Sequence, residues 1–213
     1  MSIPFTFQYA FTGPVSYTSP QISADGSGSV GIKDATLETA QAGSLSTRTD
    51  NDTGTVTMSS GGHTITTGEV VDVYWSGGVR YGMTVGTVSG TSVPIDAGSG
   101  DNLPTQDTAV TVVVQTSLNV AIDGDNVEGL FMVLSTANVS LREAGHIQLR
   151  DSTNAEIAEY DLITNVPRFI YPAYEDSNPL TGNPITNAKV SYGGTTASQT
   201  PTIIVAGTQD ASP

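Results

Sequence analysis

The sequence predicts an all-β protein, in which an antiparallel β-barrel or sandwich is followed by a jelly-roll or immunoglobulin-like β-sandwich. Short runs rich in Val and Thr recur along the 213 residues, and β-branched residues of this kind favour strands. The 23 glycines and 11 prolines fall mostly one at a time between those runs, beside Asp and Asn, as turn residues do. Connections this short pair neighbouring strands antiparallel.

Residues 1–35 are predicted to form an N-terminal arm with the first strand. Phe5, Phe7, Tyr9 and Phe11 occupy alternate positions, and a period of two places all four rings on one face of a strand. Two interpretations stay open. The strand fills the protein's own core, or it adds to the sheet of a neighbouring subunit. The four aromatic residues are therefore interface candidates.

Residues 36–116 are predicted to form the barrel or sandwich. The clearest hairpin joins Val70–Trp75 to Val79–Met83 through Ser76-Gly77-Gly78, a short Gly-containing turn. A second tight hairpin is expected around Ser89-Gly90. The expected strands are Thr36–Ala40, Gly54–Met58, Glu69–Trp75, Val79–Val88, Thr91–Ile95 and Ala109–Gln115.

Residues 117–213 are predicted to form the second sandwich, because eight strands in this length match the strand density of jelly-roll and immunoglobulin-like folds. The only helical turn expected is Val133–Asn138. The expected strands are Leu118–Ile122, Val127–Leu134, Ala137–Leu141, Ile147–Asp151, Ala155–Leu162, Phe169–Tyr174, Ile185–Tyr192 and Thr202–Gly207.

The charge balance limits the classes of partner. The chain has 21 acidic and only 7 basic residues, a formal net charge of −14, so it lacks the cationic surface that nucleic acids and anionic lipids require. An acidic surface of this kind keeps a protein soluble through self-repulsion, or it binds a basic protein partner or divalent cations. Cysteine is absent, which excludes disulfides and thiol chemistry. Residues 1–5 include no basic residue and no continuous apolar run, so we expect no secretion signal there. The sequence also has no apolar stretch of the ~20 residues that span a membrane.

No catalytic constellation stands out, so we expect the protein not to be an enzyme. The two histidines, His63 and His146, occur without a recognisable nucleophile motif. Carboxylate pairs of the kind that hydrolyse glycosides are Asp50/Asp52, Asp123/Asp125, Glu156/Glu159 and Glu175/Asp176.

Two further sites have competing interpretations. Asp123, Asp125 and Asn126 have the alternating oxygen-ligand pattern of calcium loops, but the same residues also form ordinary turns. No other cofactor is indicated. Trp75, the only tryptophan, precedes a Gly-Gly turn. It is either a sugar-stacking platform or a ring that caps the mouth of the barrel.

The chain resembles small all-β structural proteins of tailed-bacteriophage particles, such as head decoration (cement) proteins and tail accessory proteins. The resemblance lies in the aromatic N-terminal segment, the Cys-free Thr/Val/Gly strands, the acidic composition and the stretch Gly61–Trp75. It implies a virion protein, assembled in the host cytoplasm, that contacts the major capsid protein and copies of itself. The alternatives are a tail tube or tail accessory protein, and a carbohydrate- or receptor-binding module that stacks sugars on Trp75.

Overall fold

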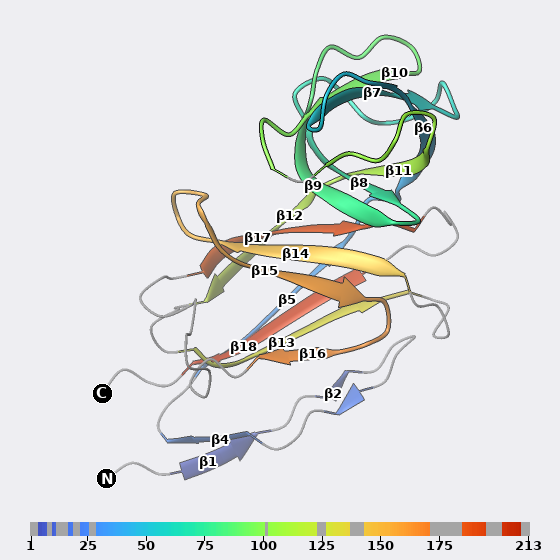
Figure 1. Cartoon of the computed structure of the whole chain (residues 1–213). Coiled ribbons are helices and arrows are strands. Elements are labelled where there is room, and N and C mark those ends of the chain that lie inside the picture. The colour runs from blue at the N-terminus through green and yellow to red at the C-terminus, as the bar shows by residue number, and fades with distance from the viewer. Residues whose placement is uncertain are drawn as a thin grey trace. The chain divides into compact units, whose positions relative to one another are not determined.

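The computed structural model of the chain describes residues 4–7, 10–11, 17–18, 22–25, 29–100, 102–122, 127–136, 143–170, 185–194 and 202–209. Strands and no helix are found in these segments (Figure 1), so the all-β prediction is confirmed. The helical turn expected at Val133–Asn138 is wrong for its first three residues, which belong to a strand. Neighbouring strands supply hydrogen-bond partners there, and a single helical turn could not replace them.

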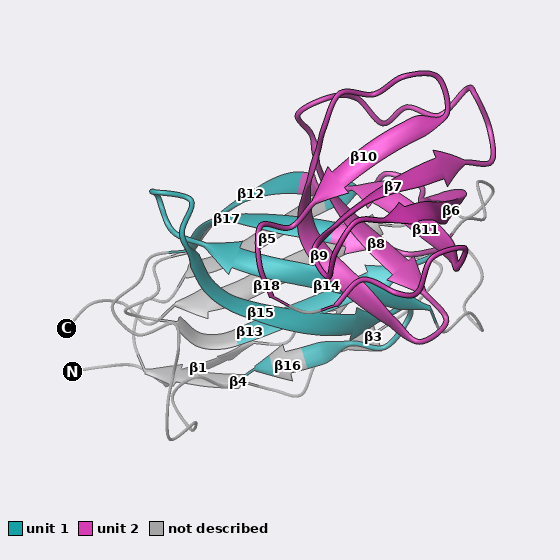
Figure 2. Ribbon diagram, turned by 45° about the horizontal axis from the view of Figure 1, so that its top comes forward, with its two compact units in different colours: residues 1–37, 117–190, 199–213 teal, residues 38–116, 191–198 magenta. Residues whose placement is uncertain are grey.

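The chain divides into two compact units (Figure 2). Unit 1 comprises residues 1–37, 117–190 and 199–213, and unit 2 comprises residues 38–116 and 191–198. The barrel and the sandwich are both present, but the barrel interrupts the sandwich in sequence and does not precede it. The N-terminal residues, expected to form a separate arm, group with unit 1.

Unit 2 contains a closed antiparallel barrel whose strands follow one another around the ring in the order β10-β7-β6-β11-β8-β9. Pairing of β10 with β9 closes the ring, which removes the exposed strand edges of an open sheet. Alternate residues point inward, as in the buried Val56 and Met58 of β7. The strands are β6 (Gln41–Arg48), β7 (Thr53–Met58), β8 (Val70–Trp75), β9 (Gly78–Val85), β10 (Ser92–Asp96) and β11 (Ala109–Val114).

The sequence misplaced one barrel strand. Residues 37–40, expected to be extended, lie outside any strand, and the missed strand β6 begins at Gln41. β6 has a single large apolar residue, Leu45, which is fully buried in the barrel core. Gly43 supplies close packing there, because an added Cβ would lie 2.7 Å from a methyl group of Val56. A strand built from small residues has no strong hydrophobic alternation to reveal it.

Unit 1 contains two four-stranded sheets, shown one above the other in Figure 1, with strand orders β12-β17-β14-β15 and β16-β13-β18-β5. Lettered A to H along the chain, the strands form sheets B-G-D-E and A-H-C-F, which is the strand order of a jelly roll. The strands are β5 (Ser29–Thr36), β12 (Thr116–Ile122), β13 (Val127–Ser135), β14 (Ala144–Arg150), β15 (Glu156–Ile163), β16 (Arg168–Ile170), β17 (Ile185–Tyr192) and β18 (Thr202–Gln209). The barrel is therefore inserted between strands A and B.

The N-terminal segment folds back on itself. β1 (Pro4–Phe7) pairs antiparallel with β4 (Ile22–Asp25), and inside this hairpin β2 (Ala10–Phe11) pairs with β3 (Tyr17–Thr18). The expected single strand from Phe5 to Phe11 is thus divided between β1 and β2, because two separate partners take up its backbone groups. Phe5 and Phe7 lie in β1 and Phe11 in β2, whereas Tyr9 lies outside the described residues.

Candidate functional site

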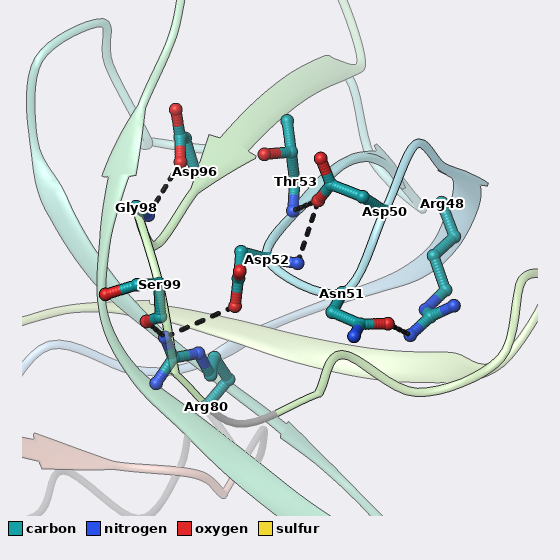
Figure 3. A network of polar contacts seen from close by, with 9 residues as sticks. All are labelled: Arg48, Asp50, Asn51, Asp52, Thr53, Arg80, Asp96, Gly98 and Ser99. Carbon is teal, nitrogen blue, oxygen red and sulfur yellow. Dashed lines mark hydrogen bonds and ion pairs between the residues drawn. The ribbon is translucent and has the colours of Figure 1, made fainter.

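The turn between β6 and β7 holds the first acidic pair singled out in the sequence (Figure 3). Asp50 Oδ1 accepts hydrogen bonds from the backbone N–H groups of Asp52, at 2.9 Å, and Thr53, at 2.7 Å. These donors stabilise the ionised carboxylate, so the pKa of Asp50 lies below its usual value of 3.8. The carboxylate of Asp50 therefore closes the turn, as Asp side chains commonly do.

Arg80 of β9 organises the neighbouring loop (Figure 3). Its guanidinium donates a hydrogen bond to the carbonyl oxygen of Ser99, and its Nη2 lies 3.8 Å from Asp52 Oδ1. The loop wraps closely around this group, because a Cβ on Gly100 would lie 2.9 Å from Nη2. Asp96 is engaged separately, accepting from the N–H of Gly98 at 2.7 Å. The carboxylates at this end of the barrel thus have individual protein partners.

The predicted calcium loop of Asp123, Asp125 and Asn126 lies outside the described residues. Within the described part of the chain, no cluster of three or more His, Asp or Glu side chains could hold a metal ion.

His63 fixes the turn that precedes β10. Its Nε2 lies 2.8 Å from the carbonyl oxygen of Gly90, and this contact requires a proton on Nε2. The ring also lines an open cavity of about 570 Å³ together with Met58, Gln41 and Thr64. Gln41 and Thr64 hold each other through two hydrogen bonds, of 2.8 and 3.1 Å. The lining of the cavity therefore includes both apolar and polar side chains.

The second histidine, His146, belongs to unit 1, so the two histidines are in different units. It lies on β14, is 1% exposed, and its Nε2 is 3.4 Å from Glu159 Oε2 on β15. Glu156, the other member of this carboxylate pair, accepts from Gln148 Nε2 at 3.0 Å. The two glutamates of β15 thus contact different side chains of β14. Of the remaining pairs, Asp123/Asp125 and Glu175/Asp176 lie outside the described residues.

Trp75 ends β8, and its half-buried ring packs against the barrel core. The ring lies over the turn, since a Cβ on Gly78 would be 3.0 Å from its Cζ2 atom. Tyr74, the preceding residue, is only 7% exposed and meets Tyr81 edge-on, with ring centroids 6.2 Å apart. Tyr74 therefore offers little ring surface to a sugar, and Trp75 offers part of its ring at the rim of the barrel.

No pattern in the sequence predicted that Ser191 and Gly193 would contact the barrel. The hydroxyl group of Tyr74 lies 2.7 Å from Ser191 Oγ, and Thr111 Oγ1 donates to the carbonyl oxygen of Gly193 at 3.0 Å. Gly193 itself abuts the Tyr74 ring. These contacts join the end of β17 and the residue after it to the barrel strands β8 and β11, and both Ser191 and Gly193 belong to unit 2.

A buried carboxylate on β8 was also missed. Asp72 is fully buried and accepts from the N–H of Gly82 at 2.7 Å and from Gln115 Nε2 at 2.9 Å. It lies where the pairing of β8 with β9 shifts register, so it supports an irregular part of the barrel wall. The only signal in the sequence was the presence of an acid within the apolar run Val70–Trp75. An acid in a buried strand indicates a carboxylate with hydrogen-bond partners, because a buried charge requires them.

Comparisons with known proteins give no relative: no family model, no curated protein and no solved structure matches the chain. Among the described residues, none forms a helix suited to crossing a membrane.

Proposed function

We propose that this protein is a non-enzymatic structural component of a phage-like virion, located on the outside of the head as a decoration protein. The observation that carries the proposal is the architecture: a jelly roll with a closed barrel inserted between its first two strands. Jelly rolls are frequent in viral capsid and lectin domains.

The charge distribution favours an exterior position. With 21 acids against 7 bases, the protein would be repelled by packaged DNA at short range. An acidic outer protein instead suits contacts with basic patches of a shell protein and keeps particles apart in solution. The proposed partners are the major capsid protein and further copies of this chain.

A symmetric electron-microscopy reconstruction of the particle tests the proposal. Density for this chain at regular positions on the outer shell, in contact with the major shell protein, is the expected result. Density along the tail would favour the alternative of a tail tube or tail accessory protein. Absence of the protein from purified particles would exclude all virion positions.

The N-terminal hairpins allow a second test. A variant that lacks residues 1–25 should fold, because the eight strands of the jelly roll begin at Ser29. If the aromatic segment contacts neighbouring subunits, this variant should bind empty particles more weakly than the full chain. A truncated protein that fails to fold would show instead that Phe5, Phe7 and Phe11 fill the protein's own core, where each ring could contribute roughly 1.5–3 kcal/mol.

Carbohydrate binding is the competing function, and the cavity beside His63 is the observation that favours it. Its lining includes the polar side chains of Gln41 and Thr64, which could hydrogen-bond a sugar, and the apolar side chains of Ala42 and Met58. A glycan array with the full chain and with Ala42→Trp tests this, since Ala42 is an exposed residue of the lining and the larger ring there should fill the cavity and abolish binding. A wild-type protein that binds no glycan would exclude this function.

A further inference from the structure

β15 lies at the edge of the sheet β12-β17-β14-β15. On its inner side it pairs antiparallel with β14, in regular register from Ala144↔Ile163 to Leu149↔Ala158. No described strand pairs with its outer side. An edge of this kind presents backbone donors and acceptors that a further strand can use.

Three hydrogen bonds identify which residues of β15 point outward. Thr164 donates its N–H inward to Glu143 at 2.9 Å, whereas the carbonyl oxygen of Ile163 accepts from the N–H of Val166 at 3.1 Å. The carbonyl oxygen of Asp161 accepts from Arg168 Nη1 at 3.1 Å, also away from β14. Orientation alternates along an antiparallel strand, so the N–H and carbonyl of Glu159 point outward too. No described residue bonds these two groups.

Arg168 limits the free part of this edge. Its guanidinium donates a hydrogen bond to the carbonyl oxygen of Asp161 and lies 4.8 Å from the centroid of the Tyr160 ring. The carbonyl oxygen of Asp161 therefore already has a partner. The opposite end of β15 has a register irregularity, between Leu149 and Arg150 on β14, where Ile157 has no direct partner. A short segment pairing around Glu159 would therefore fit between these two features.

The side chains along the edge are acidic. Glu159 is 53% exposed, and Glu156 and Asp161 are exposed as well. Opposite charges on paired strands stabilise the pairing, whereas like charges directly opposite one another destabilise it. A second copy of β15 would place these acids against one another. Charge complementarity thus selects a basic segment from a different protein.

We propose that the outer edge of β15 binds an extended segment of a partner protein, carrying Lys or Arg at alternate positions, by strand addition. The backbone of Glu159 supplies a donor and an acceptor for main-chain pairing, and the surrounding carboxylates select basic side chains. This proposal rests on the edge strand and not on the virion assignment, so the two can fail separately.

The test uses the full chain and two acetylated, amidated heptapeptides, Thr-Lys-Val-Lys-Thr-Lys-Val and the same peptide with Glu in place of Lys. NMR titration follows the amide of Glu159 and its rate of hydrogen exchange. The Lys peptide at millimolar concentration should slow this exchange at least tenfold, and the Glu peptide should leave it unchanged. Raising the salt concentration should weaken the effect, because the attraction is screened.

Two substitutions separate the backbone from the charge. Glu159→Gln keeps the outward N–H and removes the charge, so it should weaken peptide binding severalfold. Glu159→Pro also removes the N–H and should abolish binding. The variant should still fold, because proline is tolerated where the N–H of an edge strand faces outward. Its effect is followed through the shifts of neighbouring amides. Glu38→Gln, an exposed acid of unit 2, is the matched control and should bind like the wild type.

Several results would overturn the proposal. They are unchanged Glu159 exchange with the Lys peptide, equal binding of both peptides, or undiminished binding by a folded Glu159→Pro variant. Slow Glu159 exchange that depends on protein concentration, without any peptide, would show that a second copy occupies the edge. Melting curves of each variant establish that it is folded.

Discussion

Replacing Gly193 with alanine should destabilise the barrel unit, because this glycine leaves room for the Tyr74 ring. A Cβ at position 193 would lie 2.7 Å from Cγ and 2.8 Å from Cδ1 of Tyr74, closer than real Cβ atoms approach. The ring cannot simply swing away. It is 7% exposed, meets Tyr81 edge-on and holds Ser191 through its hydroxyl.

The size of the effect follows from these contacts. Overpacking a well-packed site costs about 1–3 kcal/mol, and loss of the Tyr74–Ser191 hydrogen bond would add about 1 kcal/mol. The φ angle of Gly193 lies outside the left-handed region, so alanine suits the backbone and returns up to about 1 kcal/mol through the unfolded state. The expected net loss is about 2 kcal/mol, equivalent to a decrease in the Tm of a unit of this size of about 8–16 °C.

Trp75 provides the assay, because it is the only tryptophan and packs against the barrel core. Thermal and urea unfolding followed by its fluorescence report on unit 2 directly. Gly61→Ala is the matched control, since a Cβ there meets nothing within 4 Å and its φ also lies outside the left-handed region. Equal unfolding midpoints for Gly193→Ala and Gly61→Ala would refute the reasoning, and so would an undiminished loss for Gly193→Ala in a Tyr74→Ala background.

Three further predictions concern other parts of the molecule. Hydrogen bonds from the side chain of Thr153 and the N–H of Ala155 lower the pKa of Asp151, as backbone donors lower that of Asp50. The stability these carboxylates contribute is therefore complete above their unfolded pKa, near 3.8, and is lost as the pH falls through the lower folded values. The variant with Asp50→Asn and Asp151→Asn should therefore lose less stability than the wild type as the pH is lowered below about 4, measured in acid-unfolding curves. Equal losses in the two proteins would contradict this. Asn165→Ala should lower the free energy of unfolding by about 2 kcal/mol in urea titrations, because the buried side chain would lose its two hydrogen bonds with Thr136 and alanine is strained at a φ of 61°. A loss below about 0.5 kcal/mol would contradict this prediction. Arg80→Met should accelerate amide exchange in the loop after β10, where the guanidinium binds a carbonyl; unchanged exchange would show that the loop holds itself.

Local patterns in the sequence were sufficient for much of the barrel. The hairpin of β8 and β9 was predicted from its short Gly-containing turn, because a tight turn fixes its own strands. β9 begins one residue earlier than predicted, at Gly78, which pairs with Trp75. Strand β17 was predicted with its observed bounds, since its apolar residues mark it clearly. In contrast β6 was missed, because its packing depends on Gly43 lying against β7, a contact that hydrophobicity does not express.

The candidate sites were less predictable than the fold. Asp50, singled out in the sequence as one of a carboxylate pair, closes a turn through two backbone hydrogen bonds, a purely local arrangement. Nothing local indicates that His146 would lie 3.4 Å from Glu159, because that contact depends on the register of β14 against β15. The docking of Ser191 and Gly193 against Tyr74 likewise joins residues more than a hundred positions apart.

The sequence by itself determined the all-β class, most strand positions and the acidic character of the surface, because side-chain period, turn residues and charge are properties of short segments. Only the tertiary structure decided that the barrel interrupts a jelly roll and that β15 is left at an edge. Strands in a sandwich have similar patterns whichever neighbours they pair with. Their order is set by which combination buries both sheets and closes the barrel, and that choice belongs to the whole chain.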